Sequence, residues 1–101
     1  MGSRIIITEA DIHHHLHMRM EQRGVSLDEI ERTVNEGWDA SDAKERTTGR
    51  VFVFPYNSDW EGQYFEEKEV TVYYRYKDDR IILLTVKARY GGNFVRGGKT
   101  E

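Results

Sequence analysis

The feature that most constrains the fold is one apolar stretch, residues 80–94, which reads R-I-I-L-L-T-V-K-A-R-Y-G-G-N-F. Residues 81–86 are apolar or β-branched without a break, and the stretch contains no proline and no acidic residue. Such a run is typical of a strand buried on both faces, so it predicts a central strand of a sheet. Lys87, Arg89 and Tyr90 follow it before two glycines end the strand. The far end of this predicted strand is therefore a candidate site.

The chain has the length and composition of one small globular domain. It has 101 residues, of which 38% are hydrophobic, 12% aromatic and 33% charged. We expect a single domain over residues 1–95 and a flexible tail over residues 96–101. The sequence has neither an apolar run of about 18 residues nor a charged-then-apolar leader, so we expect no membrane span and no secretion signal. The lack of cysteine excludes disulfides and thiol catalysis, and these features together favour the cytoplasm.

The charges are unevenly distributed along the chain. The formal net charge is −3, which argues against a non-specific nucleic-acid binder. Residues 75–101 nevertheless carry seven basic and three acidic residues, a net of +4, so residues 1–74 carry −7. The positive charge therefore surrounds the apolar stretch, either as a solvated hairpin edge or as part of a site.

Two helices are predicted before the sheet. The first spans about residues 9–23, with Thr8 as its N-cap and Gly24 ending it. The second runs to about Glu36, and Ser26 and Glu29 form a capping box at its start. Because only a few residues separate the helices, they are expected to form an αα-hairpin. The apolar stripes of the two helices are Ile12, Leu16 and Met20, and Leu27, Ile30 and Val34.

The remaining chain predicts antiparallel strands. Residues 50–56 and 67–77 are strand-like, residues 3–8 read as a short edge strand, and residues 57–64 read as a turn or long loop. Asp78 and Asp79 predict a two-residue turn into the strand formed by the apolar stretch at residues 80–94. The expected fold class is α+β, with an N-terminal αα-hairpin packed on a three- to four-stranded antiparallel sheet.

The two-residue turn predicts a register for the last two strands. It places Tyr76 opposite Ile81, Tyr74 opposite Leu83 and Val72 opposite Thr85. In this register one face carries Val70, Val72, Tyr74 and Tyr76 together with Ile81, Leu83, Thr85, Lys87 and Arg89. The other face carries Ile82, Leu84, Val86 and Ala88, and we expect it to receive the helices. A slip of one residue would exchange the faces.

Residues 15–30 read H-L-H-M-R-M-E-Q-R-G-V-S-L-D-E-I, and residues 81–86 read I-I-L-L-T-V. They resemble a family of small uncharacterised bacterial and archaeal domains with an H-A-x-x-R-M-x-x-R-G-I-S-x-x-[DE]-I motif followed by an I-I-T-V strand. The resemblance to this family covers roughly residues 13–92, and the family in turn is similar to the RelE/ParE toxin superfamily. The residues that fit the first motif are His15, Arg19, Met20, Arg23, Gly24, Val25, Ser26, Glu29 and Ile30.

The end of the chain also resembles a toxin. Residues 76–80 leading to Arg89 and Tyr90 are similar to the YoeB-type ending, although Gly91 and Gly92 stand where that ending has His-Tyr. The resemblance implies a RelE/ParE-like fold. It also implies one of two activities, since RelE and YoeB types are ribosome-dependent mRNA endonucleases and ParE types are gyrase poisons.

Metal-independent RNA cleavage needs a base, an acid and cations on the phosphate. In this hypothesis Lys87 and Arg89 bind and stabilise phosphate, Tyr90 is the acid or a stacking group, and Arg75, placed on the opposite face by the register above, is an auxiliary cation. Tyr74 and Tyr76 are candidates for stacking on bases. The competing interpretation is a solvated strand end with ordinary sheet tyrosines. No cofactor is implied.

Four histidines, His13, His14, His15 and His17, form the second notable group. His13 and His17 have the i, i+4 spacing of two metal ligands on a helix, but no third ligand is evident. His15, which flanks the apolar stripe, is expected to pack or hydrogen-bond against the sheet, and we expect no metal site. Arg19 and Arg23 are expected to pair with Glu29 or Glu31. Trp38 is expected in the core, and Trp60 as a loop anchor or a partner contact.

Two functions are compatible with the sequence. The first is a toxin-like, metal-independent RNA endonuclease whose partners are RNA or the ribosome and a small antitoxin-like protein. The second is a non-catalytic protein-interaction module of the same fold. No membrane partner is expected, and the sequence leaves the oligomeric state open.

Overall fold

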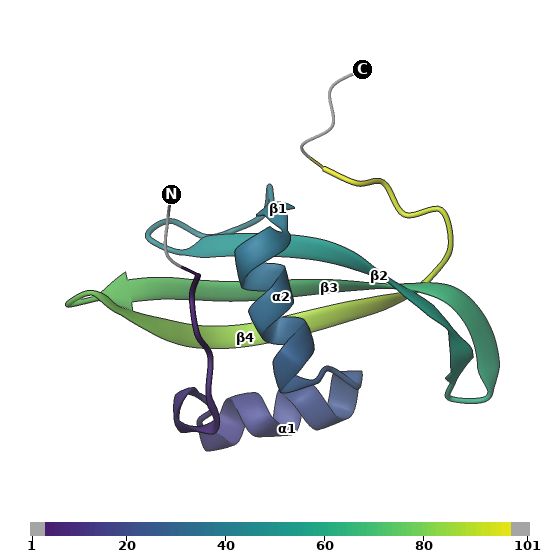
Figure 1. Cartoon of the computed structure of the whole chain (residues 1–101), viewed down its shortest axis with the longest axis horizontal. Helices are drawn as coiled ribbons and strands as arrows, with labels where there is room; N and C mark the ends of the chain where they lie inside the picture. Colours follow the sequence, from purple (N-terminus) through teal and green to yellow (C-terminus); the bar gives the residue numbers. More distant parts are fainter. Residues whose placement is uncertain (1–3, 98–101) are drawn as a thin grey trace.

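The structure is a computed structural model and describes residues 4–97. Two helices, α1 (His14–Arg23) and α2 (Leu27–Glu36), cover one face of an antiparallel sheet (Figure 1). The strand order is β1-β2-β3-β4, and neighbouring strands are antiparallel. The bounds are Trp38–Asp39 for β1, Thr48–Trp60 for β2, Gln63–Lys77 for β3 and Arg80–Gly91 for β4. The expected α+β class, with two helices packed on a four-stranded antiparallel sheet, is confirmed.

The N-terminal segment is extended but joins no strand, so the expected edge strand at residues 3–8 is wrong over residues 4–8; Ser3 lies outside the described residues. The side chain of Asn35 on α2 binds both backbone groups of Ile5, accepting from the nitrogen at 2.7 Å and donating to the oxygen at 2.8 Å. The Ile7 nitrogen donates to Glu31 at 2.9 Å. Helix side chains therefore satisfy the backbone groups that a neighbouring strand would have satisfied.

The first helix begins later than the sequence predicts. Thr8 and Asp11 do form a capping box, but they close only a short 3₁₀ turn, η1 (Glu9–Asp11). The chain then extends, and the Nδ1 of His13 accepts a hydrogen bond from the Leu16 nitrogen at 3.2 Å, so His13 is the N-cap of α1. The other caps are as predicted: Gly24 is left-handed with φ of 73°, and Ser26 and Glu29 form the box of α2.

The segment expected to be a loop, residues 57–64, is instead the end of a long β-hairpin. β2 and β3 remain paired up to Trp60 and Gln63, around a two-residue turn in which Glu61 and Gly62 have positive φ. A register shift between Pro55 and Ser58 separates this hairpin arm from the rest of the sheet. The arm extends beyond the helices in Figure 1. A bulge next to the proline allows the strand to continue past a residue that donates no hydrogen bond.

A bulge in β4 corrects the predicted assignment of faces. Tyr76 pairs with Ile81 and Tyr74 with Leu83, as expected, but Val72 pairs with Val86 instead of Thr85. The register shifts between Tyr73 and Tyr74, so β4 contains one extra residue there, and the side chains before and after it change phase. As a result the helix-covered face combines Val70, Val72 and Tyr74 with Leu83, Val86 and Ala88.

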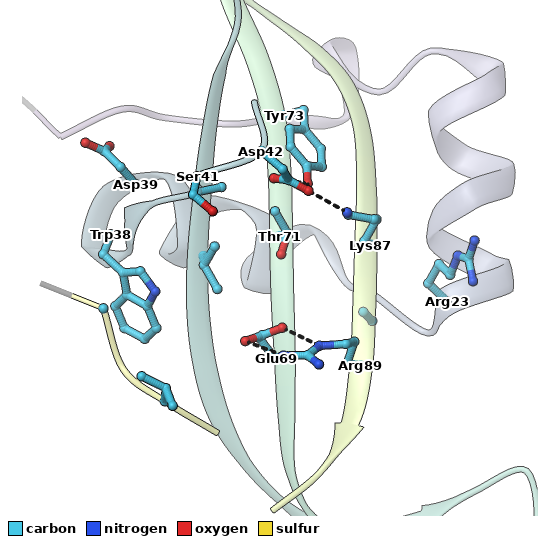
Figure 2. A pocket seen from close by; sticks show the side chains of 15 residues that line it. Arg23, Trp38, Asp39, Ser41, Asp42, Glu69, Thr71, Tyr73, Lys87 and Arg89 are labelled. Atoms are coloured by element: carbon cyan, nitrogen blue, oxygen red, sulfur yellow. Dashed lines mark hydrogen bonds and ion pairs between the residues drawn. The ribbon is translucent and has the colours of Figure 1, made fainter. Parts of the chain in front are cut away.

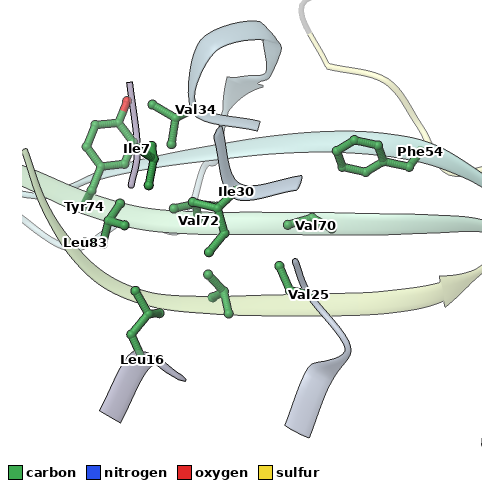
Figure 3. Packing of buried hydrophobic residues seen from close by; sticks show 11 residues of the cluster. Ile7, Leu16, Val25, Ile30, Val34, Phe54, Val70, Val72, Tyr74 and Leu83 are labelled. Carbon is green, nitrogen blue, oxygen red and sulfur yellow. The ribbon is translucent and has the colours of Figure 1, made fainter. Parts of the chain in front are cut away.

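The core lies between the helices and this face of the sheet (Figure 3). Leu16 from α1 and Ile30 from α2 are fully buried against Val70 and Val72 of β3. The apolar run that predicted a central strand forms β4 at the edge of the sheet, and α1 packs against it. The packing of α1 thus buries one face of β4 although this strand lies at the edge of the sheet. Neither helix in residues 4–97 is long and apolar enough to cross a membrane.

Candidate functional site

The face of the sheet that the helices leave uncovered, here called the open face, contains a cavity of about 520 Å³ (Figure 2). Alternate residues of β3 and β4 project into it, with Thr71 opposite Lys87 and Glu69 opposite Arg89. The loop after β1 forms one rim. Residues that line the cavity include Trp38, Val51, Thr71, Tyr73, Lys87 and Arg89. The volume is in the range of small-ligand sites, and the wall is both aromatic and charged.

Lys87 is bound to the rim of the cavity. Its Nζ lies 3.1 Å from Asp42 Oδ2, and the Tyr73 hydroxyl donates to the same carboxylate at 2.8 and 3.0 Å. The Tyr73 hydroxyl, followed by Lys87, lowers the pKa of Asp42. Hydrogen bonding to Tyr73 and then to Asp42 raises the pKa of Lys87, and burial raises that of Tyr73. At neutral pH the three groups are therefore a lysine cation, a carboxylate and a neutral phenol.

Arg89 is also paired with a carboxylate, but through two hydrogen bonds instead of one. Its Nε and Nη2 donate to the two oxygens of Glu69 at 2.8 and 3.2 Å, a bidentate pair across the strands. The Glu69 side chain is only 14% exposed, whereas that of Arg89 is 68% exposed. Hydrogen bonding to Glu69 raises the pKa of Arg89. Both predicted phosphate ligands thus lie on the open face, and each already holds a carboxylate of the chain.

Tyr90 lies on the opposite face of the sheet, so the structure does not bring it together with Lys87 and Arg89. Its hydroxyl donates to the Arg23 carbonyl oxygen at 2.6 Å, and its ring stacks on Trp60 with centroids 4.7 Å apart. Tyr56 and Phe65 complete this aromatic cluster. Burial is the main cause that raises the Tyr90 pKa well above its ordinary value. The phenol therefore attaches the hairpin arm and β4 to the end of α1.

Lys68, which was not singled out in the sequence, lies at the centre of this region. It is 3% exposed, and its Nζ donates to the carbonyl oxygen of Gly24 and, at 2.8 Å, to Glu29 Oε1. The Nζ also lies 5.6 Å from the ring centroids of Tyr56 and Tyr90. Strand alternation was the available signal, because it places Lys68 in phase with the buried Val70 and Val72.

The other predicted nucleic-acid residues are dispersed. Tyr74 is buried on the helix-covered face, where no base can stack on it. Tyr76 is exposed and packs edge-on against Tyr74, with centroids 6.0 Å apart. Alternation along β3 places the exposed Arg75 on the open face with Tyr73, which corrects its predicted separation from Lys87. Arg75 does not line the cavity.

The histidines form no common site in the structure. His13 bonds the Leu83 carbonyl through Nε2 at 3.1 Å while its Nδ1 caps α1, which assigns the neutral tautomer with its proton on Nε2. His17 instead pairs with Glu21 at 3.7 Å. Within residues 4–97, no three metal-ligating side chains are grouped so as to hold an ion.

The contacts correct two further expectations and decide between the two roles left open for Trp60. Trp38 lines the cavity on the open face and packs against Phe52, with centroids 6.0 Å apart, instead of filling the core. The carboxylates expected to pair with Arg19 and Arg23 have other partners, since Glu29 binds Lys68 and Glu31 accepts from the Ile7 nitrogen. Trp60 is an anchor of the arm, one of the two roles that the sequence left open.

The open face is therefore suited to binding more than to acid–base chemistry. Lys87 and Arg89 are each paired with a carboxylate, and the Tyr73 hydroxyl is hydrogen-bonded to the carboxylate of Asp42. No family model matches the chain, and neither a curated protein nor a solved structure matches it.

Proposed function

We propose that this chain is a non-catalytic protein-interaction module with a RelE/ParE-like arrangement of helical hairpin and sheet. The open face would receive a small protein partner. One observation carries the proposal: Lys87 and Arg89, the cations that a nuclease would use on phosphate, hold Asp42 and Glu69, while Tyr90 is on the other face. A group that stabilises a transition state must have donors free where charge develops.

The mixed charge of the open face supports a protein partner. Two acid–base pairs lie beside the half-buried side chains of Trp38 and Val51, which line the cavity. Protein interfaces typically combine an aromatic or apolar centre with a polar rim of this kind. Polyanion sites, in contrast, depend on unpaired Lys and Arg that release counterions.

Charge reversal tests this surface directly. A tagged full-length chain would be expressed in its natural host, and its cross-linked partners would be compared with those of Lys87→Glu/Arg89→Glu. Lys77→Glu/Arg80→Glu, at the exposed β3–β4 turn, changes the charge equally and is the matched control. We expect one specific partner that only the open-face variant loses. Equal capture by all three chains would contradict the proposal.

The second candidate is a toxin-like mRNA endonuclease. It is supported by the resemblance of residues 15–30 and by the exposure of Lys87 and Arg89 side by side on one face. Induced expression should then arrest growth with cleavage of ribosome-bound mRNA, and Lys87→Ala/Arg89→Ala should relieve the arrest. The interaction module predicts growth without cleavage for both chains, so this comparison separates the two functions.

A further inference from the structure

The last described residues, 93–97, fold back over the open face. They follow the end of β4, and the yellow trace beside Trp38 in Figure 2 is the part of this segment that lies on the β1 side of the sheet. Gly97 lies so close to Trp38 that a Cβ there would overlap the indole ring. Val95 and Gly97 line the cavity together with Trp38. This segment, here called the strap, therefore forms a wall of the cavity from the chain's own C-terminal part.

Glu67 holds the strap through both of its oxygens. Oε1 accepts from the backbone nitrogen of Phe94 at 2.9 Å, and Oε2 accepts from Arg96 at 3.0 Å. Arg96 also donates to the Phe94 carbonyl oxygen at 3.0 Å, which closes a small ring of bonds. One carboxylate of β3 thus recognises an extended backbone and the arginine two residues further on.

The ring of Phe94 contacts the guanidinium of Arg89 at the same time. The guanidinium carbon of Arg89 lies 4.9 Å from the centroid of the Phe94 ring, a cation–π contact on the side of Arg89 that Glu69 leaves free. The strap therefore contains an F-x-R motif that binds two side chains, the Glu67 carboxylate and the Arg89 guanidinium.

The strap is also weakly held. Val95, between the two anchoring residues, is 84% exposed. Ion pairs and cation–π contacts at exposed positions contribute little each. Because the tether is short, the strap nevertheless competes at an effective concentration on the order of millimolar. A free segment with the same contacts and additional ones to the cavity would replace it.

We propose that the strap is a tethered occupant of the open face, and that the partner docks an extended segment with an aromatic residue followed two positions later by Arg or Lys. The inference rests on the proposed interaction function and adds the chemistry of the partner. The partner's aromatic ring would take the place of Phe94 over Arg89, and its cation would take the place of Arg96 on Glu67. Displacement of the strap would uncover Trp38.

A peptide of the chain's own sequence, acetyl-GGNFVRGGKT-amide, is the probe. Its binding to the full-length chain would be measured by calorimetry, with the Phe→Ala peptide as control. The protein variant Phe94→Ala/Arg96→Ala releases the strap and leaves Glu67 and Arg89 intact. Glu67→Gln releases the strap and removes half of its receptor. Labelling with 5-fluorotryptophan provides a resonance for Trp38, which is assigned with Trp38→Phe.

If the strap is closed about nine-tenths of the time, releasing it raises the apparent affinity about tenfold. We therefore expect Phe94→Ala/Arg96→Ala to bind the peptide about tenfold more tightly than the wild type, and Glu67→Gln to bind it no better than the wild type. The Trp38 resonance of the released variant should move toward that of the wild type as peptide is added, because the peptide takes the place of the strap beside Trp38. The Phe→Ala peptide should bind about two- to fivefold more weakly, because the Phe carries the exposed cation–π contact to Arg89.

Equal affinity of the wild type and the released variant would overturn the role of the strap as a competitor. Equal binding of the two peptides, or no binding to the released variant, would overturn the partner chemistry. These failures are distinct from failure of the proposed function. The charge-reversal experiment and the growth assay decide that question without reference to the strap.

Discussion

Arg89 and Glu69 face each other across β3 and β4 with two hydrogen bonds of 2.8 and 3.2 Å, and this pairing withdraws the guanidinium from other anions. The same holds for Lys87 and Asp42 at 3.1 Å. The charges of Lys87 and Arg89 on the open face are therefore balanced by two carboxylates. We therefore expect the partners of this face to depend on its carboxylates as well as on its cations.

Removing those carboxylates should convert the open face into an anion site. We expect Asp42→Asn/Glu69→Gln to bind a single-stranded RNA oligonucleotide more tightly than the wild type. The slope of log K against log salt should steepen by about 1.4, because each freed cation adds about 0.7. Fluorescence anisotropy over a salt series measures both quantities. Asp28→Asn/Glu61→Gln alters two exposed acids elsewhere and should leave the slope almost unchanged.

If the control variant gains as much RNA affinity as Asp42→Asn/Glu69→Gln, net charge alone would explain the result. The pairing across the open face would then have no particular role in selecting partners.

Lys68 supports a second prediction, on stability. We expect Lys68→Ala to lower the free energy of unfolding by about 3 kcal/mol, because Glu29 and the Gly24 carbonyl lose their buried partner. Lys68→Met keeps most of the side-chain volume but also leaves Glu29 unpaired, so it should recover only part of the loss. Lys44→Ala, at an exposed loop position, should change stability by less than about 0.5 kcal/mol.

Urea unfolding followed by circular dichroism measures these changes. A Lys68→Met chain as stable as the wild type would mean that the Lys68 side chain contributes packing alone. The bonds of its ammonium to Glu29 and Gly24 would then add no net stability.

Much of the helical part was predictable from short-range chemistry. Ser26 and Glu29 reproduce a capping box, and Gly24 adopts the left-handed conformation that only glycine enters freely. These features depend on residues three or four apart. Their geometry is therefore determined locally, and the sequence shows it directly.

The sheet was less predictable because its faces depend on one bulge. The extra residue of β4 near Leu84 leaves no composition signal, yet it moves Val86 relative to Val72 and so decides which side chains share a face with Lys87. The proximity of Asp42 to Lys87, 45 positions apart, likewise depends on how a loop folds over the sheet. The candidate cations were predictable, but the carboxylates that neutralise them were not.

Gly24 and Gly62, the two glycines with positive φ within residues 4–97, provide a matched pair for a third prediction. Gly24 and Gly62 have φ of 73° and 87°, so alanine is strained by about 1 kcal/mol at either position. A Cβ at Gly24 would also lie 2.6 Å from Trp60 and 2.8 Å from the Tyr90 hydroxyl, whereas one at Gly62 would meet nothing within 4 Å. We expect Gly24→Ala to cost at least about 1 kcal/mol more than Gly62→Ala.

Chemical denaturation of the two variants gives this difference directly. Equal losses would show that the arm carrying Trp60 moves away without cost, and that the aromatic cluster does not hold it against α1.

His13 leads to a fourth prediction, because it connects the start of α1 with the bulged region of β4. Its Nδ1 caps the helix at the Leu16 nitrogen, and its Nε2 reaches the Leu83 carbonyl. We expect His13→Ala to destabilise the chain by about 1 to 2 kcal/mol, and His13→Asn, which retains a capping side chain, to recover about half. His14→Ala, exposed at the next position, is the control and should have little effect.

Thermal and urea unfolding would compare the four chains. Loss of stability in His14→Ala equal to that in His13→Ala would assign the effect to helix propensity instead of the two hydrogen bonds.

The last prediction concerns pH, and it follows from the two carboxylates whose folded-state pKa is lowered. Hydrogen bonds from Tyr73 and then Lys87 lower the pKa of Asp42 from 3.8, and those from the Phe94 nitrogen and then Arg96 lower that of Glu67 from 4.5. A carboxyl with a lowered folded pKa contributes stability that is present above its unfolded pKa and is lost as the pH falls through the folded value. Stability should therefore decline below about pH 4.5.

Urea midpoints at about pH 6 and about pH 3 measure this decline, and Asp42→Asn/Glu67→Gln should make it shallower, since neither replacement titrates. Asp28→Asn/Glu61→Gln removes two acids of the same types and should keep the slope of the wild type. The protection of the Phe94 amide against hydrogen exchange, taken relative to an unprotected amide at the same pH, should fall over the same pH range, because protonated Glu67 is a weaker acceptor for the strap. Unchanged protection at Phe94 would mean that the charge on Glu67 does not hold the strap in place.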